Sequence, residues 1–478
     1  MNYKTIRYIL SWVLKTEALC MLLPLTCALV SREHTISDWF FSIVLCLLFG
    51  TLLCIKAPEK KGMYVKDGFV TVAFSWILLS FFGAIPLAIT KSTPSFINAL
   101  FESVSGFTTT GASVISNLDN LPKSIIFWRS FSHWIGGMGV LVFLLAFIPV
   151  TGNNNFFLVK AESPGPAVTK LTPKVKATAK ILYFIYIALT IFEIILLLLG
   201  RLSFFEAVTL SFGTAGTGGF SISKAGFSGY SSYVHIVVTV FMILFGIDFS
   251  IYYLILLRKF RLVFKSDELK MYLLVVFSFI AIITFNCRHL FSSVFETLKH
   301  SSFQVASLIT TTGYASTDFN VWPELSKTLL VLLMFFGACA GSTGGGIKIS
   351  RVLIMLKSIV KEVRTLAHPK SVLKIKMNGR VIEHETVRAV NVFMMSYILI
   401  FVLSMLFVSL DNFDFTTNFT AVLATLNNIG PGLSRVGPME NFDIFSPVSK
   451  FILVCNMLIG RLEIFPILIA VSPYTWKK

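Results

Sequence analysis

Long apolar stretches separated by short polar links follow one another along the whole chain. A helix needs ~20 apolar residues to cross the hydrocarbon core of a bilayer, so we interpret each long stretch as one membrane span. The stretches interpreted in this way are residues 8–30, 38–55, 69–90, 125–150, 181–200, 233–257, 271–286, 326–362, 389–410 and 449–470. This pattern predicts an all-α polytopic membrane protein with ten membrane spans.

Four shorter apolar stretches lie between pairs of these spans and are too short to cross. Each is followed by a glycine-containing loop, and the next span comes after that loop. The short stretches are residues 95–107, 204–213, 302–310 and 416–426. Each predicts a re-entrant half-helix. The chain therefore reads as four repeats of span, half-helix, loop and span, preceded by an N-terminal two-helix hairpin.

The expected domain boundaries follow from this order. Residues 1–66 form the N-terminal hairpin, and the four repeats occupy residues 67–160, 161–265, 266–385 and 386–478. The third repeat differs from the others because its second span is interrupted and is followed by a basic segment that we place in the cytoplasm.

The four loops resemble one another in sequence. SGFTTTGAS at 105–113 is nearly repeated by TTTGYAS at 310–316, while TGGFS at 217–221 and NNIGPG at 427–432 are weaker copies. The anchoring glycines, spaced by 108, 94 and 117 residues, are Gly111, Gly219, Gly313 and Gly430. A single TTTG string is most simply a turn, but four copies between similar flanking spans favour a shared function.

Four such loops can meet on one axis and present a ring of backbone carbonyls, which replaces the water around a small cation. Glycine permits the backbone angles that turn carbonyls inward. The half-helices would point their C-terminal ends inward, where partial negative charge favours a cation. The loops therefore predict a pore for a small cation.

Composition supports a membrane protein. The 478 residues are 55% hydrophobic and 14% charged, whereas soluble proteins carry roughly 25% charged residues. The seven cysteines form no CxxC pair, which argues against a zinc site or a disulfide framework.

The formal charge of +17 could indicate a protein that binds nucleic acid. The distribution of the basic residues argues against that interpretation. Most Lys and Arg lie in six segments: the N-terminus, 56–66, 160–180, 258–270, 348–388 and 477–478. These segments alternate with poorly basic ones, as expected when basic loops stay on the cytoplasmic side. We therefore expect membrane lipids as neighbours, no nucleic-acid partner, and both termini on the cytoplasmic side of the membrane.

A glycine-rich stretch interrupts the span at 326–362. It combines Gly337, Gly341, Ser342, Thr343, Gly344, Gly345 and Gly346. Each glycine costs a helix ~1 kcal/mol against alanine, so this stretch predicts a flexible gating loop below the ring. Small residues for close helix packing are the other interpretation.

Arg461 lies in the last span, where a charge costs ~2.5–3.5 kcal/mol on insertion scales. We expect it to face the pore beside the glycine-rich loop, as an electrostatic barrier and an anchor for the loop. An ion pair with Glu463 is the alternative, although residues two apart on a helix do not face each other.

Acidic residues near the outer loops either concentrate cations at the entry or are ordinary loop residues. They are Glu102, Asp119, Glu206, Glu296, Asp318, Glu324 and Asp443. The chain shows no paired catalytic carboxylates and no His–Ser or His–Cys arrangement, so we do not expect an enzyme. A membrane enzyme or receptor that uses the loops only as packing turns is the alternative from another class.

Several longer stretches resemble the Trk/Ktr/HKT superfamily of cation transporters, and within it the TrkH-type potassium uptake proteins. They are SGFTTTGAS at 105–113, FWRSFSHWIGGMGVLVF at 127–143, TGGFS at 217–221, TTTGYASTDF at 310–319, GACAGSTGGGIK at 337–348, NNIGPG at 427–432 and IGRLEIFP at 459–466. The N-terminal hairpin is also similar to the TrkH type, whereas KtrB lacks it. The resemblance implies four M1–P-loop–M2 repeats around a single pore, commonly in a homodimer.

The resemblance also implies the residues of a selectivity filter. These are Thr109, Thr110, Gly111, Thr217, Gly218, Gly219, Thr311, Thr312, Gly313, Asn428, Ile429 and Gly430. Bound K+ is expected at Thr110, Gly111, Gly218, Gly219, Thr312, Gly313, Ile429 and Gly430. No organic cofactor is expected in this chain. The implied gate comprises 341–346 and Arg461, and the implied partner is a cytoplasmic TrkA-type nucleotide-binding ring.

Some points stay open at this stage. Relatives with serine at the first filter glycine prefer sodium, so Gly111 favours potassium, and a sodium-coupled or sodium-conducting relative is the alternative. Either Gly218 or Gly219 can be the second filter glycine, although the residues that follow favour Gly219. The fourth loop has Asn428 and Ile429 in place of threonines, so we expect its side chains to brace it less.

Overall fold

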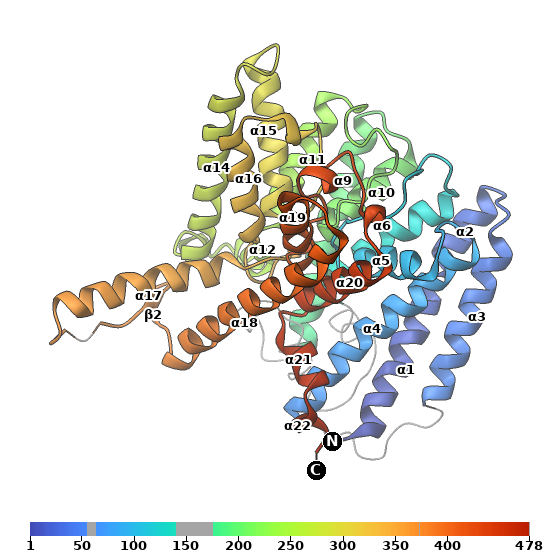
Figure 1. Cartoon of the computed structure of the whole chain (residues 1–478), viewed down its shortest axis with the longest axis horizontal. Coiled ribbons are helices and arrows are strands. Elements are labelled where there is room, and N and C mark those ends of the chain that lie inside the picture. The colour runs from blue at the N-terminus through green and yellow to red at the C-terminus, as the bar shows by residue number, and fades with distance from the viewer. Residues whose placement is uncertain (55–63, 140–174, 372, 478) are drawn as a thin grey trace.

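The computed structural model describes residues 1–54, 64–139, 175–371 and 373–477. In this part of the chain the protein is almost entirely helical (Figure 1). The N-terminal half contains α1 (Tyr3–Cys20), α2 (Leu22–Val30), α3 (Ile36–Leu53), α4 (Val65–Ile89), α5 (Phe96–Phe107), α6 (Lys123–Gly137), α9 (Val175–Leu199), α10 (Phe204–Gly216), α11 (Ser232–Phe245), α12 (Phe249–Leu256) and α13 (Phe260–Val263).

The C-terminal half continues the helical pattern and adds one small hairpin of two strands. Its main elements are α14 (Asp267–Cys287), α15 (Val294–Ile309), α16 (Glu324–Phe335), α17 (Ile349–Ala367), β1 (Lys376–Met377), β2 (Arg380–Val381), α18 (His384–Val408), α19 (Phe415–Leu426), α20 (Pro447–Arg461), α21 (Phe465–Val471) and α22 (Pro473–Trp476). Short 3₁₀ turns lie at Phe319–Val321, Ser409–Asp411, Ser434–Val436 and Phe442–Ile444.

Within the described residues, six helices are long and apolar enough to cross a membrane, or up to eight if two bent pairs each count as one. The six are Tyr3–Val30, Ile36–Leu53, Val65–Ile89, Ala177–Leu199, Asp267–Cys287 and His384–Asp411. Only 22% of the apolar window is buried in the last two, so their remaining apolar surface suits contact with lipid. A polytopic helical architecture is thus confirmed.

Two predicted spans are bent rather than continuous. Residues 233–257 form α11 and α12, which meet at 91°, and residues 449–470 form α20 and α21, which meet at 118°. The first bend follows Gly246, and the side chain of Asp248 caps the new helix by accepting from Ser250 N at 2.9 Å. The second bend contains Ile464 with φ of 70°. An unbroken run of apolar residues hides both bends in the sequence.

Two other predicted spans need qualification. The span predicted at 326–362 is divided into α16 and α17, with residues 336–348 between them, which confirms the predicted interruption. The span predicted at 125–150 begins with α6, but residues 140–150 lie outside the described residues.

The four short helices α5, α10, α15 and α19 form at the predicted half-helices, although α15 begins earlier than expected. Each begins with a side-chain oxygen that accepts a backbone N–H three residues on, which is a standard way to satisfy a helix N-terminus. The capping residues are Ser95, Ser203, Ser293 and Asp414. Hydrogen bonds from Thr417 hold the pKa of the Asp414 carboxyl below its usual value, so it stays charged beside the positive end of α19.

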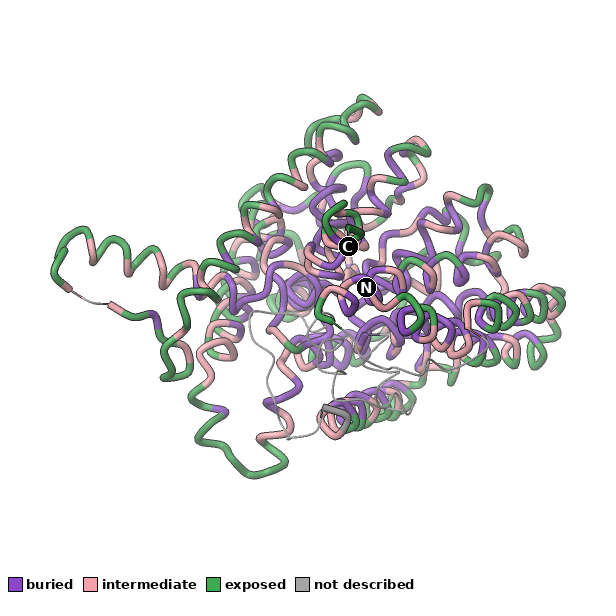
Figure 2. Tube along the Cα trace, turned by 90° about the horizontal axis from the view of Figure 1, so that it is seen from below, coloured by how far each residue is buried: buried purple, intermediate pink, exposed green. Residues whose placement is uncertain are grey.

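The short helices and the loops after them form the buried centre of the molecule. Figure 2 shows buried residues gathered in the middle and exposed residues on the outlying helices. The two ends of the chain lie close together (Figure 1), and the rings of Tyr3 and Trp476 stack at 6.4 Å between centroids. The N-terminal hairpin packs α1 against α3 and α4, at one side of this centre.

Small residues bring α6 against the central loops. A Cβ built at Gly136 would lie closer than 3.0 Å to the carbonyl oxygen of Phe107, and one at Gly216 would approach the His133 carbonyl equally closely. Glycine is therefore required here by the close approach of another backbone.

Replacing Gly136 with alanine is expected to destabilise the protein by about 1–3 kcal/mol, the usual cost of overpacking. The added methyl group would push α6 away from the end of α5. The apparent melting temperature, measured by size-exclusion chromatography after heating in detergent, should fall. Gly50→Ala in α3 is the control, because its Cβ would meet its nearest atom at 3.3 Å and gains helix propensity. An equal fall in both variants would contradict this explanation.

Candidate functional site: a ring of four loops with a second loop beneath it

The four glycine loops meet in a closed circuit. A Cβ built on each anchoring glycine would come closer than 3.0 Å to a backbone carbonyl oxygen of the next loop. The contacts run from Gly111 to Gly218 O, from Gly219 to Thr312 O, from Gly313 to Ile429 O and from Gly430 to Thr110 O. Each loop therefore touches the next, and the fourth returns to the first.

The four loops also share one backbone conformation. In each, the anchoring glycine and the residue two positions before it both have positive φ. The pairs are Thr109 and Gly111 (55° and 78°), Thr217 and Gly219 (54° and 74°), Thr311 and Gly313 (58° and 83°), and Asn428 and Gly430 (56° and 98°). A non-glycine residue rarely adopts this conformation, so four coincident cases mark the loops as equivalent.

This geometry decides between the tandem glycines of the second loop. Gly219 has the positive φ of the other anchors. A Cβ at Gly218 would instead collide with the ring of His133, whose Nδ1 lies 2.8 Å from the carbonyl oxygen of Gly106. Gly218 is therefore needed for packing against α6, and its carbonyl group faces the first loop.

Hydroxyl groups brace two of the loops. The Oγ1 atoms of Thr108 and Thr110 are 2.8 Å apart, and those of Thr310 and Thr312 are also 2.8 Å apart. All four threonines are buried. Thr108 Oγ1 and Thr310 Oγ1 also donate to carbonyl oxygens of Val104 and Ala306, which ties each loop to the end of its helix.

The expectation of weaker bracing in the fourth loop is wrong. Asn428 Nδ2 donates to Thr110 Oγ1 at 3.0 Å and to the carbonyl oxygen of Met457 at 2.9 Å. The asparagine thus joins the fourth loop to the first loop and to α20. Local sequence could not reveal this, because Asn428 and Thr110 are 318 positions apart.

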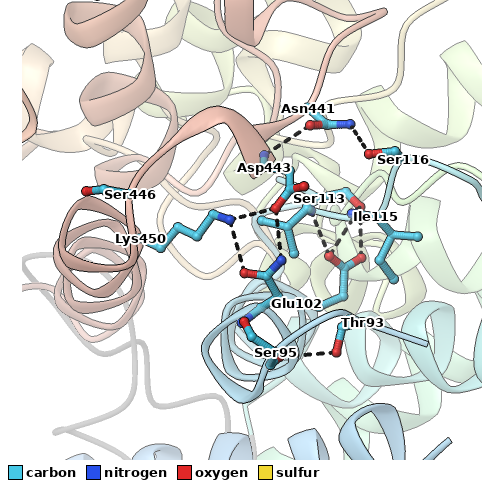
Figure 3. A network of polar contacts seen from close by, with 12 residues as sticks. Thr93, Ser95, Glu102, Ser113, Ile115, Ser116, Asn441, Asp443, Ser446 and Lys450 are labelled. Atoms are coloured by element: carbon cyan, nitrogen blue, oxygen red, sulfur yellow. Dashed lines mark hydrogen bonds and ion pairs between the residues drawn. The ribbon is translucent and has the colours of Figure 1, made fainter. Parts of the chain in front are cut away.

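A buried ion pair supports the first loop from behind. Arg129 Nε donates to Glu102 Oε1 at 2.7 Å, and Glu102 also accepts from Ser113 Oγ at 3.0 Å and Val114 N at 3.0 Å. Glu102 and Arg129 are almost fully buried. Figure 3 shows the Glu102 carboxylate pointing at Ser113. Glu102 therefore holds the loop and is not a solvated acid at the entry.

The other outer acids are also engaged locally. Asp443 accepts from Lys450 Nζ at 2.6 Å and from Asn98 Nδ2 at 2.9 Å, and Asn441 reaches Ser116 Oγ at 3.0 Å (Figure 3). These contacts join residues 441–450 of the fourth repeat to Asn98 in α5 and to Ser116 after the first loop. The remaining acids cap helices or turns or contact nearby groups: Asp119, Glu206, Glu296, Asp318 and Glu324.

A cavity of about 260 Å³ lies on one side of the ring. All four anchoring glycines line it, together with Ser113, Ser221 and Arg129. On the described residues of this chain, no group of three or more His, Cys, Asp or Glu side chains could hold a metal ion. At the ring, backbone carbonyl groups of each loop lie against the anchoring glycine of another loop.

The glycine-rich loop lies directly beneath the ring. Gly345 N donates to Thr311 Oγ1 at 2.6 Å, and a Cβ at Gly345 would lie 2.6 Å from the carbonyl oxygen of Asn427. Of the predicted gating residues, Gly344, Gly345 and Gly346 lie against the third and fourth loops. Gly341 lies against Asp248, Ser342 Oγ donates to Cys339 O, and Thr343 Oγ1 donates to Phe245 O of α11. A second cavity, of about 90 Å³, lies against this loop and Arg461.

Two cationic side chains bind the carbonyl groups of this loop. Arg461 Nη1 donates to Thr343 O at 2.9 Å, and Nη2 donates to Gly137 O at 2.9 Å and also to Gly136 O. Lys348 Nζ donates to Gly344 O, and to Gly345 O at 3.2 Å. Arg461 lies beside the loop, where the sequence placed it. Lys348 was missed, although its position at the end of the glycine run was a usable signal.

Glu463 has a different partner from the one considered. Its carboxylate forms a salt bridge with Arg351 of α17, with a distance of 3.2 Å between Nη1 and Oε1. The Arg351 guanidinium also lies over the ring of Phe393 at 4.0 Å from its centroid. This pair ties the second half of the interrupted span to the bend between α20 and α21.

Comparison with known proteins agrees with this arrangement. The TrkH family model, described as a cation transport protein, matches residues 36–477. The Trk system potassium uptake protein TrkH of Escherichia coli strain K12 is 34% identical over the full length of both chains. The protein of the same name from Vibrio parahaemolyticus is 35% identical, again over the full length of both.

A solved structure has the same fold. The crystal structure of the potassium transporter TrkH from Vibrio parahaemolyticus superposes with a TM-score of 0.89 at 32% identity, and covers all of both chains. The agreement extends over the whole length, so the two chains share one fold. The chain is a polytopic membrane protein, and its homologues are named as transporters rather than as enzymes.

Replacing Asn428 with leucine is expected to destabilise the protein by about 1–3 kcal/mol, because it leaves the buried Met457 carbonyl group without this donor. Leucine has the same branched outline and number of side-chain heavy atoms as asparagine but no N–H donor, so both hydrogen bonds are lost. The measurement is again the apparent melting temperature in detergent. Asn120→Leu, at an exposed position in an outer turn, is the control. If Asn428→Leu melts at the wild-type temperature, the two hydrogen bonds do not support the ring.

Proposed function

The chain belongs to the TrkH family of cation transport proteins, and we propose that it takes up potassium through the ring of four loops. The closed circuit of glycine-to-carbonyl contacts carries this proposal. A ring with one loop from each quarter of the chain presents carbonyl dipoles on all sides of one axis. Such a ring substitutes for the hydration shell of K+.

The filter in this proposal consists of the residues that flank each anchor. Four carbonyl groups touch the neighbouring loop: those of Thr110, Gly218, Thr312 and Ile429. The next carbonyl group in each loop belongs to the anchoring glycine, which is Gly111, Gly219, Gly313 or Gly430. The preceding residues, Thr109, Thr217, Thr311 and Asn428, set the backbone turn through their positive φ. Potassium is the cargo of this site, and no organic cofactor takes part.

We further propose ten membrane spans in four M1–P-loop–M2 repeats after the N-terminal hairpin. The equivalent φ values in the four loops and the four capped short helices support this assignment. The two bent pairs and the two halves of the interrupted span then count as second spans of their repeats. Both termini would face the cytoplasm of the bacterial inner membrane, and their proximity in Figure 1 agrees with that.

The loop at 341–346 acts as the gate in this proposal. It lies between the ring and the side chains of Lys348 and Arg461. Its small residues permit movement without unfolding the adjacent helices. When the loop moves aside, potassium passes inward, driven by ~2.3 kcal/mol per charge for every 100 mV of membrane potential.

The proposed regulator is a cytoplasmic TrkA-type ring that docks on the basic segment 348–388, and the proposed assembly is a homodimer. The segment carries ten Lys and Arg and comprises α17, the β1–β2 hairpin and the start of α18, which project from the bundle in Figure 1. A projecting basic arm suits a partner of opposite charge.

Gly111→Ser tests the filter. Gly111 has φ of 78°, and a Cβ there would meet the carbonyl oxygen of Gly218. The carbonyl oxygens must shift, so selectivity for K+ over Na+ should fall by about tenfold, equivalent to ~1.4 kcal/mol. Uptake of K+, Rb+ and Na+ by cells that lack their own potassium transporters measures this.

Gly229→Ser is the matched control, because nothing lies within 4 Å of a Cβ there. It should transport like the wild type. Unchanged selectivity in Gly111→Ser would contradict a filter at this position, and wild-type preference for Na+ would contradict the choice of potassium.

Arg461→Gln tests the gate. The variant loses the charge-assisted hydrogen bonds to Thr343, Gly136 and Gly137, so the loop should leave the axis more often. We expect K+ flux in the absence of the ring partner to rise by about tenfold, from the loss of one bond of this strength. Proteoliposome flux assays measure it, with Arg258→Gln as the control. Reduced flux would show that Arg461 assists conduction instead.

A further inference from the structure

The first turn of α14 carries two adjacent carboxylates that bind different parts of the protein. Asp267 and Glu268 are consecutive residues, and consecutive side chains on a helix point in different directions. Glu268 faces the glycine-rich loop, and Asp267 faces the projecting arm formed by α17 and the β1–β2 hairpin. Neither residue has a role in the filter or the gate described above.

One oxygen atom of Glu268 accepts hydrogen bonds from both sides of the break between α16 and α17. Oε1 accepts from Ala340 N at 2.7 Å and from Ser350 N at 3.1 Å. Ala340 lies in the glycine-rich loop, and Ser350 lies in the first turn of α17. The carboxylate thus fixes the distance between the loop and the helix that follows it.

Asp267 is joined to the arm by three hydrogen bonds. Its Oδ2 accepts from Lys357 Nζ at 2.7 Å and from Asn378 N at 3.2 Å, and its own N–H donates to Asn378 Oδ1 at 2.8 Å. Lys357 also reaches the carbonyl oxygen of Lys376 at 2.8 Å. The tip of the hairpin, the middle of α17 and the start of α14 therefore move together.

The hairpin tip is a rigid element. Asn378 and Gly379 connect β1 to β2 and have φ of 52° and 79°, as in the tight two-residue turns that Asn-Gly favours. A rigid tip held to the same helical turn as Glu268 can transmit a displacement. A flexible loop in the same place could not.

We propose that Asp267 and Glu268 form a mechanical joint through which the arm positions the glycine-rich loop. A partner that pulls on the arm shifts the start of α14 and withdraws Glu268 from Ala340 N. The glycine-rich loop then loses the hydrogen bond from Ala340 N to Glu268. This inference rests on the proposed gate, and it assigns to Glu268 a positioning role and to Asn378 a coupling role.

Cys339 supplies a readout that does not depend on transport. It precedes Ala340 in the loop and is buried. Glu268→Ala removes the acceptor of Ala340 N, so the loop should open more often and expose the thiol. Labelling of Cys339 by a maleimide in inside-out vesicles should become about tenfold faster, the scale expected for one hydrogen bond to a charged group. The Cys339→Ser background subtracts labelling of the other six cysteines.

Glu268→Gln should restore most of the protection, because the amide oxygen still accepts from Ala340 N. Glu385→Ala is the matched control, since it removes an exposed acid from the first turn of α18. It should label like the wild type. Equal labelling rates in Glu268→Ala and the wild type would overturn the positioning role. Loss of the monodisperse size-exclusion peak in Glu268→Ala would count against it too, because Glu268 would then hold the fold and not the loop.

Asn378→Gly tests the coupling. Glycine keeps the positive φ of the turn but deletes the oxygen that accepts from Asp267 N. Labelling of Cys339 should rise, although Asn378 does not touch the loop. In the Glu268→Ala background the same change should add nothing, because the joint is already broken and the two effects are not independent.

Two outcomes would contradict the coupling: no effect of Asn378→Gly, or an effect that adds fully to that of Glu268→Ala. The proposed function is tested separately by wild-type K+ flux in the same vesicles. If flux is absent while Cys339 responds as expected, the joint stands and the transport proposal fails. If flux is present and Cys339 does not respond, the transport proposal stands and the joint fails.

Discussion

The contact on which the structure depends is that of a glycine Cα against a carbonyl oxygen of the neighbouring loop. It occurs four times, and each time there is no room for a Cβ. Carbonyl dipoles that converge on an axis repel one another, so the arrangement is stable only when the surrounding protein holds the loops in place. Much of the buried polar structure near the centre can be understood as that support.

The support differs from loop to loop. The first loop is supported by the Glu102–Arg129 ion pair and by the hydrogen bond from Asn441 to Ser116. The third loop has the hydrogen bond between the hydroxyl groups of Thr310 and Thr312. The fourth is tied by Asn428 to its neighbour. Irregular backbone in a membrane protein is tolerated only where it is buried in protein or lines a cavity. Different side chains meet this one requirement, which explains why the backbone angles agree better than the sequences.

Local patterns were sufficient to predict the elements and the glycines. Gly111, Gly219, Gly313 and Gly430 are identifiable because a glycine recurs in four similar loops, each between a short apolar stretch and a span. The short helices are visible through their length, and Arg461 through the cost of a charge in an apolar run. Each of these signals lies within a few residues of the feature it predicts.

Features that depend on distant partners were not predictable in the same way. The bracing by Asn428, the burial of Glu102 against Arg129 and the hold of Glu268 on Ala340 all join residues far apart in sequence. The bends after Gly246 and at Ile464 were hidden because apolar residues continue through them. Arg129 offered the best missed signal, since a buried guanidinium in a predicted span requires a nearby carboxylate.

The distribution of charge around the axis sets how the inner loop can work. The ring itself is lined by dipoles, while Lys348 and Arg461 bind the carbonyl groups of the loop beneath it. A cation that leaves the ring inward meets these two positive groups at short range, and their repulsion is strong where the dielectric constant is low. Because the same side chains hold the loop by hydrogen bonds, displacing the loop also breaks or moves those bonds. In the proposed gate, steric closure and electrostatic closure are therefore one event. Two acids face the loop, Asp248 before the start of α12 and Glu268 in α14, and lie where they offset part of that positive charge.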